Sequence, residues 1–328
     1  MYKLTVQIKI LATGLFLLLL TFPFKVLAKN YDEIVVFGDS FSDTGNIFNA
    51  TQKAIPPSSS YFNGRFSNGS VWVDYLASDL GINSNPKINY AYGGATTGFE
   101  NIGIEGLPGL QQQINSFTSA NQSGDPNSLY IVWAGTNDYL DYFFGGSPNP
   151  TQTVTNLIDA VKALAAVGAK DIMVVNQPNL GKFPVTGGNS LTSNILSKYS
   201  NAHNSQLSTN LNFLSQKLNS DINIFSLDVN SLYSRIIADP GEFGFTNVTD
   251  SCIGKSSVVP INIPEQPVAC APDEFLFWDQ VHPTTATHKL IAELAFSVLN
   301  LASVPEPSTV FGVILVGTLG SVALLKRS

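Results

Sequence analysis

Short apolar runs and longer amphipathic stretches alternate along the chain from residue 33 onward. The apolar runs are rich in β-branched residues, which is typical of buried strands. Between them, apolar residues recur at intervals of three and four, which predicts helices. Strands are expected at 33–38, 88–91, 128–134, 171–175 and 223–227, and helices at 70–80, 109–120, 151–167, 190–219 and 284–299. The stretch 239–278 shows neither pattern and is expected to be irregular.

This alternation indicates βαβ units, in which parallel strands form a central sheet covered by helices on both faces. The expected fold class is therefore α/β, with three layers. Residues 29–303 contain no internal repeat and no linker, so we predict a single domain there. Loops at the carboxyl ends of the strands are where chemically active groups are expected.

The first 28 residues differ from the rest of the chain. Two lysines precede an apolar run over 10–24, and Val26-Leu27-Ala28 ends the segment with small residues where a signal peptidase cleaves. This pattern predicts a secretory signal peptide over 1–28, cleaved after Ala28. An uncleaved N-terminal anchor is the alternative, which the shortness of the apolar run disfavours. The protein is therefore expected to be exported.

A second uncharged apolar run, 310–325, is followed at once by Lys326 and Arg327. As a helix it would reach about 24 Å, which is short for a bilayer core of about 30 Å, and the basic tip would stay cytoplasmic. The motif VPEPS (304–308) with this run resembles the bacterial PEP-CTERM sorting signal. The resemblance implies that 304–328 is a sorting tail processed by an exosortase-type partner, with transient membrane anchoring through 310–325. An ordinary tail anchor is the alternative.

Composition and charge exclude several classes of function. The whole chain carries −7, but its ends carry +3 over 1–28 and +1 over 304–328, which leaves −11 on 29–303. A body this acidic repels phosphate backbones, so nucleic acid is not an expected ligand. The three histidines and two cysteines are scattered and match no zinc or iron–sulfur spacing, so no metal is predicted. Because no apolar run within 29–303 approaches spanning length, a membrane-embedded transporter is excluded.

The two cysteines, Cys252 and Cys270, lie 18 positions apart in a proline-rich stretch. In the oxidising environment that export implies, they are expected to form a disulfide. Closing a loop of this length would stabilise the fold by roughly 3 kcal/mol in the chain-entropy model. Two unpaired thiols are the alternative, and neither cysteine has a histidine nearby in a recognisable catalytic signature.

Four loops carry groups that could do chemistry. Ser40, just past the first strand, could be a nucleophile or could cap a helix. Gly93-Gly94 offers unobstructed backbone N–H groups, and Asn137 offers a side-chain amide; both suit an oxyanion hole, and both also suit plain turns. Asp279 and His282 are spaced so that the carboxylate could orient the imidazole. Each group alone is ambiguous, but all four point to acyl transfer.

These four blocks, in this order, resemble those of the GDSL esterase/lipase (SGNH hydrolase) superfamily. FGDSFSDTGN is similar to the nucleophile block, with Phe41 in place of Leu, and NYAYGGATTG, GTND and DQVHPT are similar to the other three. The string YFNGRFSNGSVWVDYLA (61–77) resembles the secreted lecithinase/hemolysin and plant-type branch. The resemblance covers most of 33–300. It implies a flavodoxin-like three-layer α/β/α sandwich with a parallel sheet, and ester hydrolysis without a cofactor.

The resemblance also implies a role for each site residue. Ser40 would be the nucleophile, His282 the general acid/base and Asp279 the group that orients it. The oxyanion hole would consist of the Ser40 N–H, the Gly94 N–H and the Asn137 side chain. Gly94 is preferred over Gly93 because its distance from Asn89 fits the family block. The other matches in the first block are expected to be architectural: Gly38, Asp39, Asp43 and Asn46.

The substrate stays open at this point. An exported esterase, lipase or phospholipase acting on a small-molecule or lipid ester is the leading interpretation. A carbohydrate acetylesterase acting on surface polysaccharide is one alternative, and a non-catalytic surface or matrix protein is another. His203 is expected to face solvent and His288 to be structural or exposed. The aromatic residues after Asn137 are expected to pack on the sheet rather than to form an acyl pocket: Tyr139, Tyr142, Phe143 and Phe144.

Overall fold

The computed structural model describes residues 29–82, 88–120, 123–254 and 270–302. Residues 30–298 form one unit, and the second unit, 1–29 with 299–328, lies almost wholly outside the described residues. The predicted signal peptide, sorting tail and apolar run 310–325 all lie outside them, so these domain boundaries stay predictions. Among the described residues, no helix combines the length and apolar character needed to cross a membrane.

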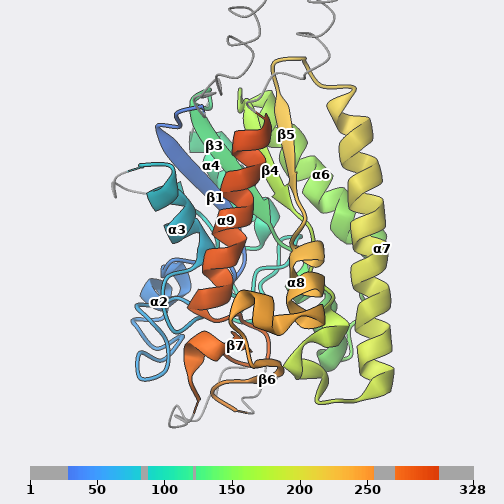
Figure 1. Cartoon of the computed structure of the whole chain (residues 1–328). Helices are drawn as coiled ribbons and strands as arrows, with labels where there is room; N and C mark the ends of the chain where they lie inside the picture. The colour runs from blue at the N-terminus through green and yellow to red at the C-terminus, as the bar shows by residue number, and fades with distance from the viewer. Residues whose placement is uncertain (1–28, 83–87, 121–122, 255–269, 303–328) are drawn as a thin grey trace, which may run out of the picture. The chain divides into compact units, whose positions relative to one another are not determined.

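A sheet of five parallel strands forms the centre of the 30–298 unit, in the order β2-β1-β3-β4-β5 (Figure 1). The strands are β1 (Glu33–Gly38), β2 (Ile88–Asn89), β3 (Ser128–Trp133), β4 (Asp171–Val175) and β5 (Asn223–Leu227). This strand order is that of flavodoxin-like doubly wound sheets. In such sheets β2 is added on one side of β1 and the later strands are added on the other side, so the strand order reverses between β1 and β3. The predicted fold class is therefore confirmed.

Helices cover both faces of the sheet. Alternate strand residues such as Phe37, Val132 and Ile172 share one core with α4 (Leu110–Ala120), α6 (Pro150–Ala166) and α7 (Ser190–Ser215). The other face is covered by α3 (Trp72–Asp79), α8 (Val229–Ala238) and α9 (Thr285–Ala302), as Figure 1 shows. Because both faces are covered, β3 and β4 are buried at every position, which explains their continuous apolar runs.

Short helical segments fill the loops between these elements. They are α2 (Asn46–Ala50), α5 (Thr136–Leu140) and the 3-10 turns at Asp141–Phe144, Leu180–Lys182, Pro184–Thr186, Pro240–Phe243 and Pro272–Glu274. The sequence pattern did not predict α8. Within 239–278, expected to be irregular, β6 (Asn247–Ser251) pairs in parallel with β7 (Phe275–Phe277). These strands are short, and β6 is at most half-buried, so no alternating apolar pattern marks it.

A small apolar cluster lies beside β7. Tyr61, Ile253 and Trp278 pack there with Cys252, and Cys270 lies against them. The structure records a disulfide between Cys252 and Cys270, with Cα atoms 5.4 Å apart. The disulfide therefore joins two loop segments next to the element that precedes Asp279 and His282 in the chain.

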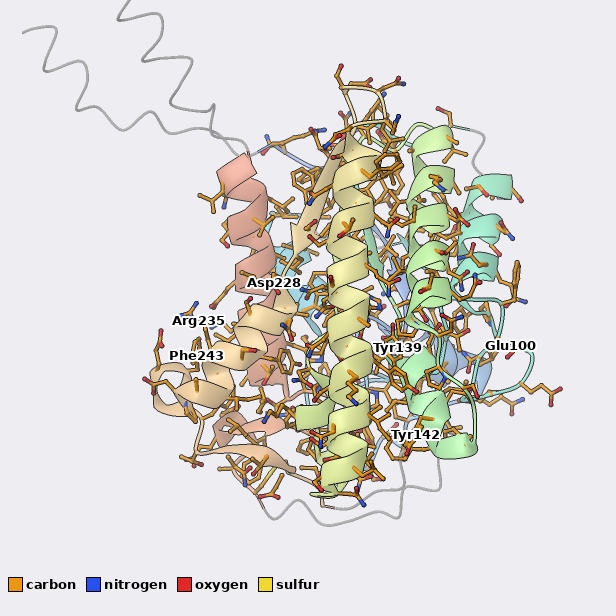
Figure 2. The ribbon with its side chains drawn as sticks, turned by 90° about the vertical axis from the view of Figure 1, so that its right-hand side faces the viewer. Glu100, Tyr139, Tyr142, Asp228, Arg235 and Phe243 are labelled. Carbon is orange, nitrogen blue, oxygen red and sulfur yellow. A yellow bond between two sulfur atoms is a disulfide. The ribbon has the colours of Figure 1, made fainter. Side chains whose placement is uncertain are left out.

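The expectation that His203 faces solvent is wrong. The buried face of α7 runs through Leu196, Ser200, His203 and Leu207, at three- and four-residue spacing. The imidazole is fully buried, its Nδ1 lies 2.8 Å from the Tyr139 Oη, and burial lowers its pKa to about 3. Tyr139 lies beside α7 in Figure 2. Two of these buried residues, Ser200 and His203, are polar, and much of the rest of the helix is polar too. The sequence pattern therefore does not reveal which face of α7 is buried.

His288 is buried as well, as a structural residue. Its Nδ1 accepts a hydrogen bond from the Trp72 N–H at 3.2 Å, which ties α9 to the start of α3. Burial is the main cause that lowers the pKa of His288 to about 3. Neither His203 nor His288 is therefore a candidate for proton transfer near neutral pH.

Candidate active site

Ser40 lies in a tight turn between β1 and α2. At Gly38, the last residue of β1, a Cβ would lie 2.1 Å from the Trp133 carbonyl oxygen, so only glycine lets the turn start so close to β3. The Asp43 carboxylate then accepts the backbone N–H groups of Gly45 (2.8 Å) and Asn46 (2.6 Å). These contacts agree with the architectural role that was expected of Gly38, Asp43 and Asn46. The turn holds the serine hydroxyl at the carboxyl edge of the sheet.

The three residues predicted to form a catalytic triad lie together. Ser40 Oγ is 2.8 Å from His282 Nε2, although 242 positions separate them. His282 Nδ1 is 2.7 Å from Asp279 Oδ2. The other carboxylate oxygen, Oδ1, accepts the backbone N–H groups of Val281 at 2.8 Å and His282 at 2.7 Å. The carboxylate is thus fixed on both oxygens, and the imidazole bridges it to the hydroxyl.

Sequence reasoning missed a fourth member of this hydrogen-bonded chain. The Tyr61 hydroxyl donates to Asp279 Oδ2 at 2.7 Å, and the Tyr61 side chain is buried. Trp278 Nε1 donates to the Ser60 carbonyl at 3.0 Å, which holds the Tyr61 loop against the residue before Asp279. Tyr61 begins the string 61–77 that carried the resemblance, but no spacing rule connects it to a carboxylate 218 positions away.

The buried carboxylates of the site differ in their electrostatics. Burial alone would raise the pKa of Asp279, but the neighbouring His282 and the hydrogen bonds from His282 and Tyr61 outweigh it and lower the pKa. Burial raises the pKa of Asp39 to about 7. Asp39 Oδ1 accepts the Phe41 N–H at 3.0 Å, whereas its buried Oδ2 has no partner among the described residues. The site therefore favours the anionic form of Asp279 and disfavours the anionic form of Asp39.

Two further donors lie at the ends of neighbouring strands. Gly94 has φ +81°, and the N–H of the preceding Gly93 is used by Asp43 Oδ2 at 2.9 Å. Within the described residues, no hydrogen bond uses the Gly94 N–H. Asn137 Nδ2 donates to the Ala95 carbonyl at 2.9 Å, which leaves the second N–H of this amide to point elsewhere. Both groups thus keep a donor that a reacting oxygen could use.

Ser40, Gly94, Asn137 and His282 line one cavity of about 50 Å³. Its other lining residues are Ile47, Phe66, Gly93, Gly103, Leu140 and Val281. Ser40 follows β1 and Asn137 follows β3, so the cavity lies at the point where the strand order reverses, a usual ligand position in such sheets. A hydroxyl with a base, an oriented base and free N–H donors can together carry out acyl transfer.

The aromatic residues after Asn137 divide into two groups. Tyr139 is buried, as expected, with its ring stacked on Tyr199 at 5.6 Å between centroids. Phe143 and Phe144 are 39% and 48% exposed, so the expectation that they pack on the sheet is wrong. Tyr142, labelled in Figure 2, packs edge-on against Phe143. Leu140, which was not singled out, is the apolar side chain of this segment that lines the cavity.

The described residues contain no group of three or more His, Cys, Asp or Glu side chains that could hold a metal ion.

Comparison with known proteins finds similarity over most of the chain. The model of the GDSL-like Lipase/Acylhydrolase family matches residues 34–295. The thermolabile hemolysin of Vibrio parahaemolyticus is 32% identical over 274 residues, which are 80% of this chain and 62% of the hemolysin. The phosphatidylcholine-sterol acyltransferase of Aeromonas hydrophila is 27% identical, covering 82% of this chain and 90% of that one. The secreted effector protein SseJ of Salmonella typhimurium is 27% identical, covering 82% of this chain and 64% of SseJ. This chain thus spans less than two thirds of the hemolysin and of SseJ.

Among solved structures, an acetylxylan esterase from Geobacillus stearothermophilus is 14% identical, covers 85% of this chain and 100% of that chain, and has a TM-score of 0.48.

Proposed function

The chain belongs to the GDSL-like lipase/acylhydrolase family, and from this premise we propose that it is an exported serine hydrolase that cleaves carboxylic esters through an acyl-enzyme on Ser40. The predicted family and the predicted class, a hydrolase of ester bonds, are confirmed. The observation that carries the proposal is the hydrogen-bonded chain from Ser40 Oγ through His282 to Asp279, with steps of 2.8 and 2.7 Å.

The first half of the reaction forms the acyl-enzyme. Neutral His282 accepts the Ser40 proton at Nε2 while Oγ attacks the ester carbonyl carbon, and Asp279 stabilises the imidazolium through Nδ1. The oxyanion that develops is stabilised by the Ser40 N–H, the Gly94 N–H and the Asn137 amide. In related sites each such donor is worth roughly 3 kcal/mol.

Departure of the alcohol completes the acyl-enzyme, and hydrolysis of the acyl-enzyme in the second half restores the enzyme. His282 gives its proton to the alcohol oxygen as the bond between carbonyl carbon and alcohol breaks, and the alcohol leaves. A water molecule then attacks the acyl carbon and passes its proton to His282 Nε2. The imidazolium returns a proton to Ser40 Oγ as the carboxylic acid departs. One ester and one water give one acid and one alcohol, so the balance needs no cofactor.

Export and sorting are parts of the proposal that rest on the sequence. The signal-peptide pattern of 1–28 supports export, and so does the similarity to a secreted effector protein. The tail 304–328 supports recognition by an exosortase-type partner. Small-molecule or lipid esters are the proposed substrate class. The complete hydrogen-bonded set of Ser40, His282 and Asp279 argues against a non-catalytic surface protein.

The test is covalent labelling combined with one substitution. A fluorophosphonate probe is expected to label the wild-type protein on Ser40, and Ser40→Ala should abolish labelling. Ser40→Ala should also lower kcat for p-nitrophenyl acetate by about 10⁴-fold or more, because no other group in the site can form the acyl-enzyme. Circular dichroism checks that the variant is folded. A folded Ser40→Ala protein with full turnover would contradict the proposal.

A further inference from the structure

The cavity in front of Ser40 is small. Its volume is about 50 Å³, whereas pockets that enclose drug-sized ligands span roughly 300–1,000 Å³. The carbonyl of any substrate must enter this space, because Ser40, Gly94, Asn137 and His282 all line it. Little room is then left for the acyl chain attached to that carbonyl.

The walls around the remaining space are apolar and buried. Four side chains form them, Ile47, Phe66, Leu140 and Val281, each at most 7% exposed. No charged side chain apart from a protonated His282 lines the cavity among the described residues. These four side chains therefore suit a hydrocarbon group of matching size and offer no hydrogen bond to a polar one.

Phe66 packs directly against the histidine of the triad. Its ring lies on the His282 ring, with centroids 4.9 Å apart, and edge-on to Tyr61 at 6.1 Å. Its far side is closed by Gly93, where an added Cβ would lie 2.6 Å from the ring. The ring that limits the cavity is thus held between the acid–base histidine, the tyrosine bound to Asp279, and the backbone.

The other walls belong to segments that buried or part-buried hydrogen bonds hold in place. The Ile47 N–H donates to Asp43 Oδ2 at 3.2 Å. Leu140 is in α5, whose Asp138 accepts the Thr97 N–H at 2.8 Å and the Thr97 hydroxyl at 2.5 Å. Enlarging the cavity would break contacts of this kind, and forcing extra methylene groups into a packed site is unfavourable.

We propose that the cavity limits the acyl group to about two or three carbons, so that the substrates are acetyl or propionyl esters rather than long-chain lipid esters. This proposal rests on the proposed function, since it names the acyl group that Ser40 accepts. The alcohol part of the ester stays outside the cavity. An acyl chain with methylene groups that do not fit loses rate because one misfitting methylene in an apolar pocket changes kcat/KM by roughly 10- to 200-fold.

The experiment is an acyl series with one leaving group. The value of kcat/KM is measured for p-nitrophenyl acetate, propionate, butyrate and octanoate on the wild-type protein, and dipalmitoyl phosphatidylcholine vesicles are tested alongside. We expect a fall of at least tenfold between propionate and octanoate. A flat or rising series, or vesicle hydrolysis as fast as that of the acetate, would overturn the short-acyl proposal. If fluorophosphonate still labels Ser40, the proposed function survives that result; failure of labelling and of every ester would contradict the function itself.

Two substitutions test whether these walls set the limit. Leu140→Ala should raise the octanoate-to-acetate ratio of kcat/KM by at least fivefold, because it removes a wall side chain without touching the triad. Ile47→Ala removes a wall side chain that α2 contributes, and it should raise the same ratio. It replaces Leu140→Ala in the test if Leu140→Ala does not fold. Leu191→Ala is the matched control, because Leu191 is 65% exposed on α7 and should leave the ratio unchanged. Folded wall variants with the wild-type ratio would overturn the proposal, and if neither folds, the wild-type series alone decides.

Discussion

Two loops meet at the active site, and both bury carboxylates, but the pKa values of these carboxylates shift in opposite directions. In the nucleophile turn (39–46), burial raises the pKa of Asp39 to about 7 and also raises the pKa of Asp43. In the acid–base loop (279–282), burial opposes the charge of Asp279 as well, yet its neighbours lower the pKa. The three carboxylates are buried to a similar depth, so the charged and hydrogen-bonding partners of each carboxylate decide the direction in which its pKa shifts.

The number of donors is not sufficient to explain this difference. Asp43 accepts four backbone N–H groups, from Gly45, Asn46, Ile47 and Gly93, and burial still dominates. Asp279 also accepts four hydrogen bonds, but one comes from His282, which becomes a cation during the reaction. At Asp279 the charge of His282 and the hydrogen bonds together outweigh burial, whereas at Asp43 four neutral N–H groups do not. A buried carboxylate therefore serves proton transfer where a side chain that can carry positive charge faces it.

The largest effect is expected from breaking the acid–base loop. In Asp279→Asn, the side-chain oxygen can keep the two backbone N–H groups, which turns the NH₂ group towards His282 Nδ1. The imidazole must then accept at Nδ1 and carry its proton on Nε2, so it cannot take the Ser40 proton. We expect kcat for p-nitrophenyl acetate to fall by about 10⁴-fold. A folded variant within tenfold of wild type would refute the role of Asp279.

A smaller effect is expected from the long-range support of this loop. Tyr61→Phe removes one donor from Asp279 Oδ2, and losing a hydrogen bond worth about 0.5–1.5 kcal/mol should lower kcat up to about tenfold. The carboxylate then holds the imidazolium more strongly, so the acid limb of the rate–pH profile should move to higher pH.

Tyr75→Phe is the matched control for Tyr61→Phe. The Tyr75 hydroxyl lies 2.8 Å from the Thr285 hydroxyl, so this variant also loses one hydrogen bond, but none of the site residues is involved. Its rate–pH profile should coincide with that of wild type. If Tyr61→Phe gives the same unshifted profile, Tyr61 supports the fold and does not tune Asp279.

An effect of a different kind is expected in the nucleophile turn, because it concerns stability and not the rate. Asp39 stays protonated up to about pH 7 in the folded protein, whereas an unfolded chain ionises near pH 3.9. Its contribution to the free energy of unfolding is thus complete below about pH 4 and is lost as pH rises towards 7. Asp39→Asn keeps an acceptor for the Phe41 N–H and should remove this loss, at most about 1.4 kcal/mol per pKa unit.

Urea unfolding of both proteins at pH 5 and pH 8 measures this difference. Wild type should lose more stability than Asp39→Asn between the two pH values. For Asp279, whose pKa is lowered, the sign is opposite: its contribution is present above the unfolded pKa and is lost as pH falls. Equal pH dependence in wild type and Asp39→Asn would show that Asp39 is ionised in the folded protein.

The sequence by itself determined the parallel strands, the order of the four blocks, the candidate residues that line the cavity, and Asp279 behind His282. The residues that line the cavity are Ser40, Gly94, Asn137 and His282. Hydrophobic period and motif order are properties of neighbouring positions, and the carboxyl ends of parallel strands meet at one edge. Only the tertiary structure decided that Tyr61 supports Asp279, that His203 is buried, and that Phe66 and Leu140 narrow the cavity. These contacts join elements far apart in the chain, and their geometry depends on how helices pack on the sheet, which no local pattern encodes.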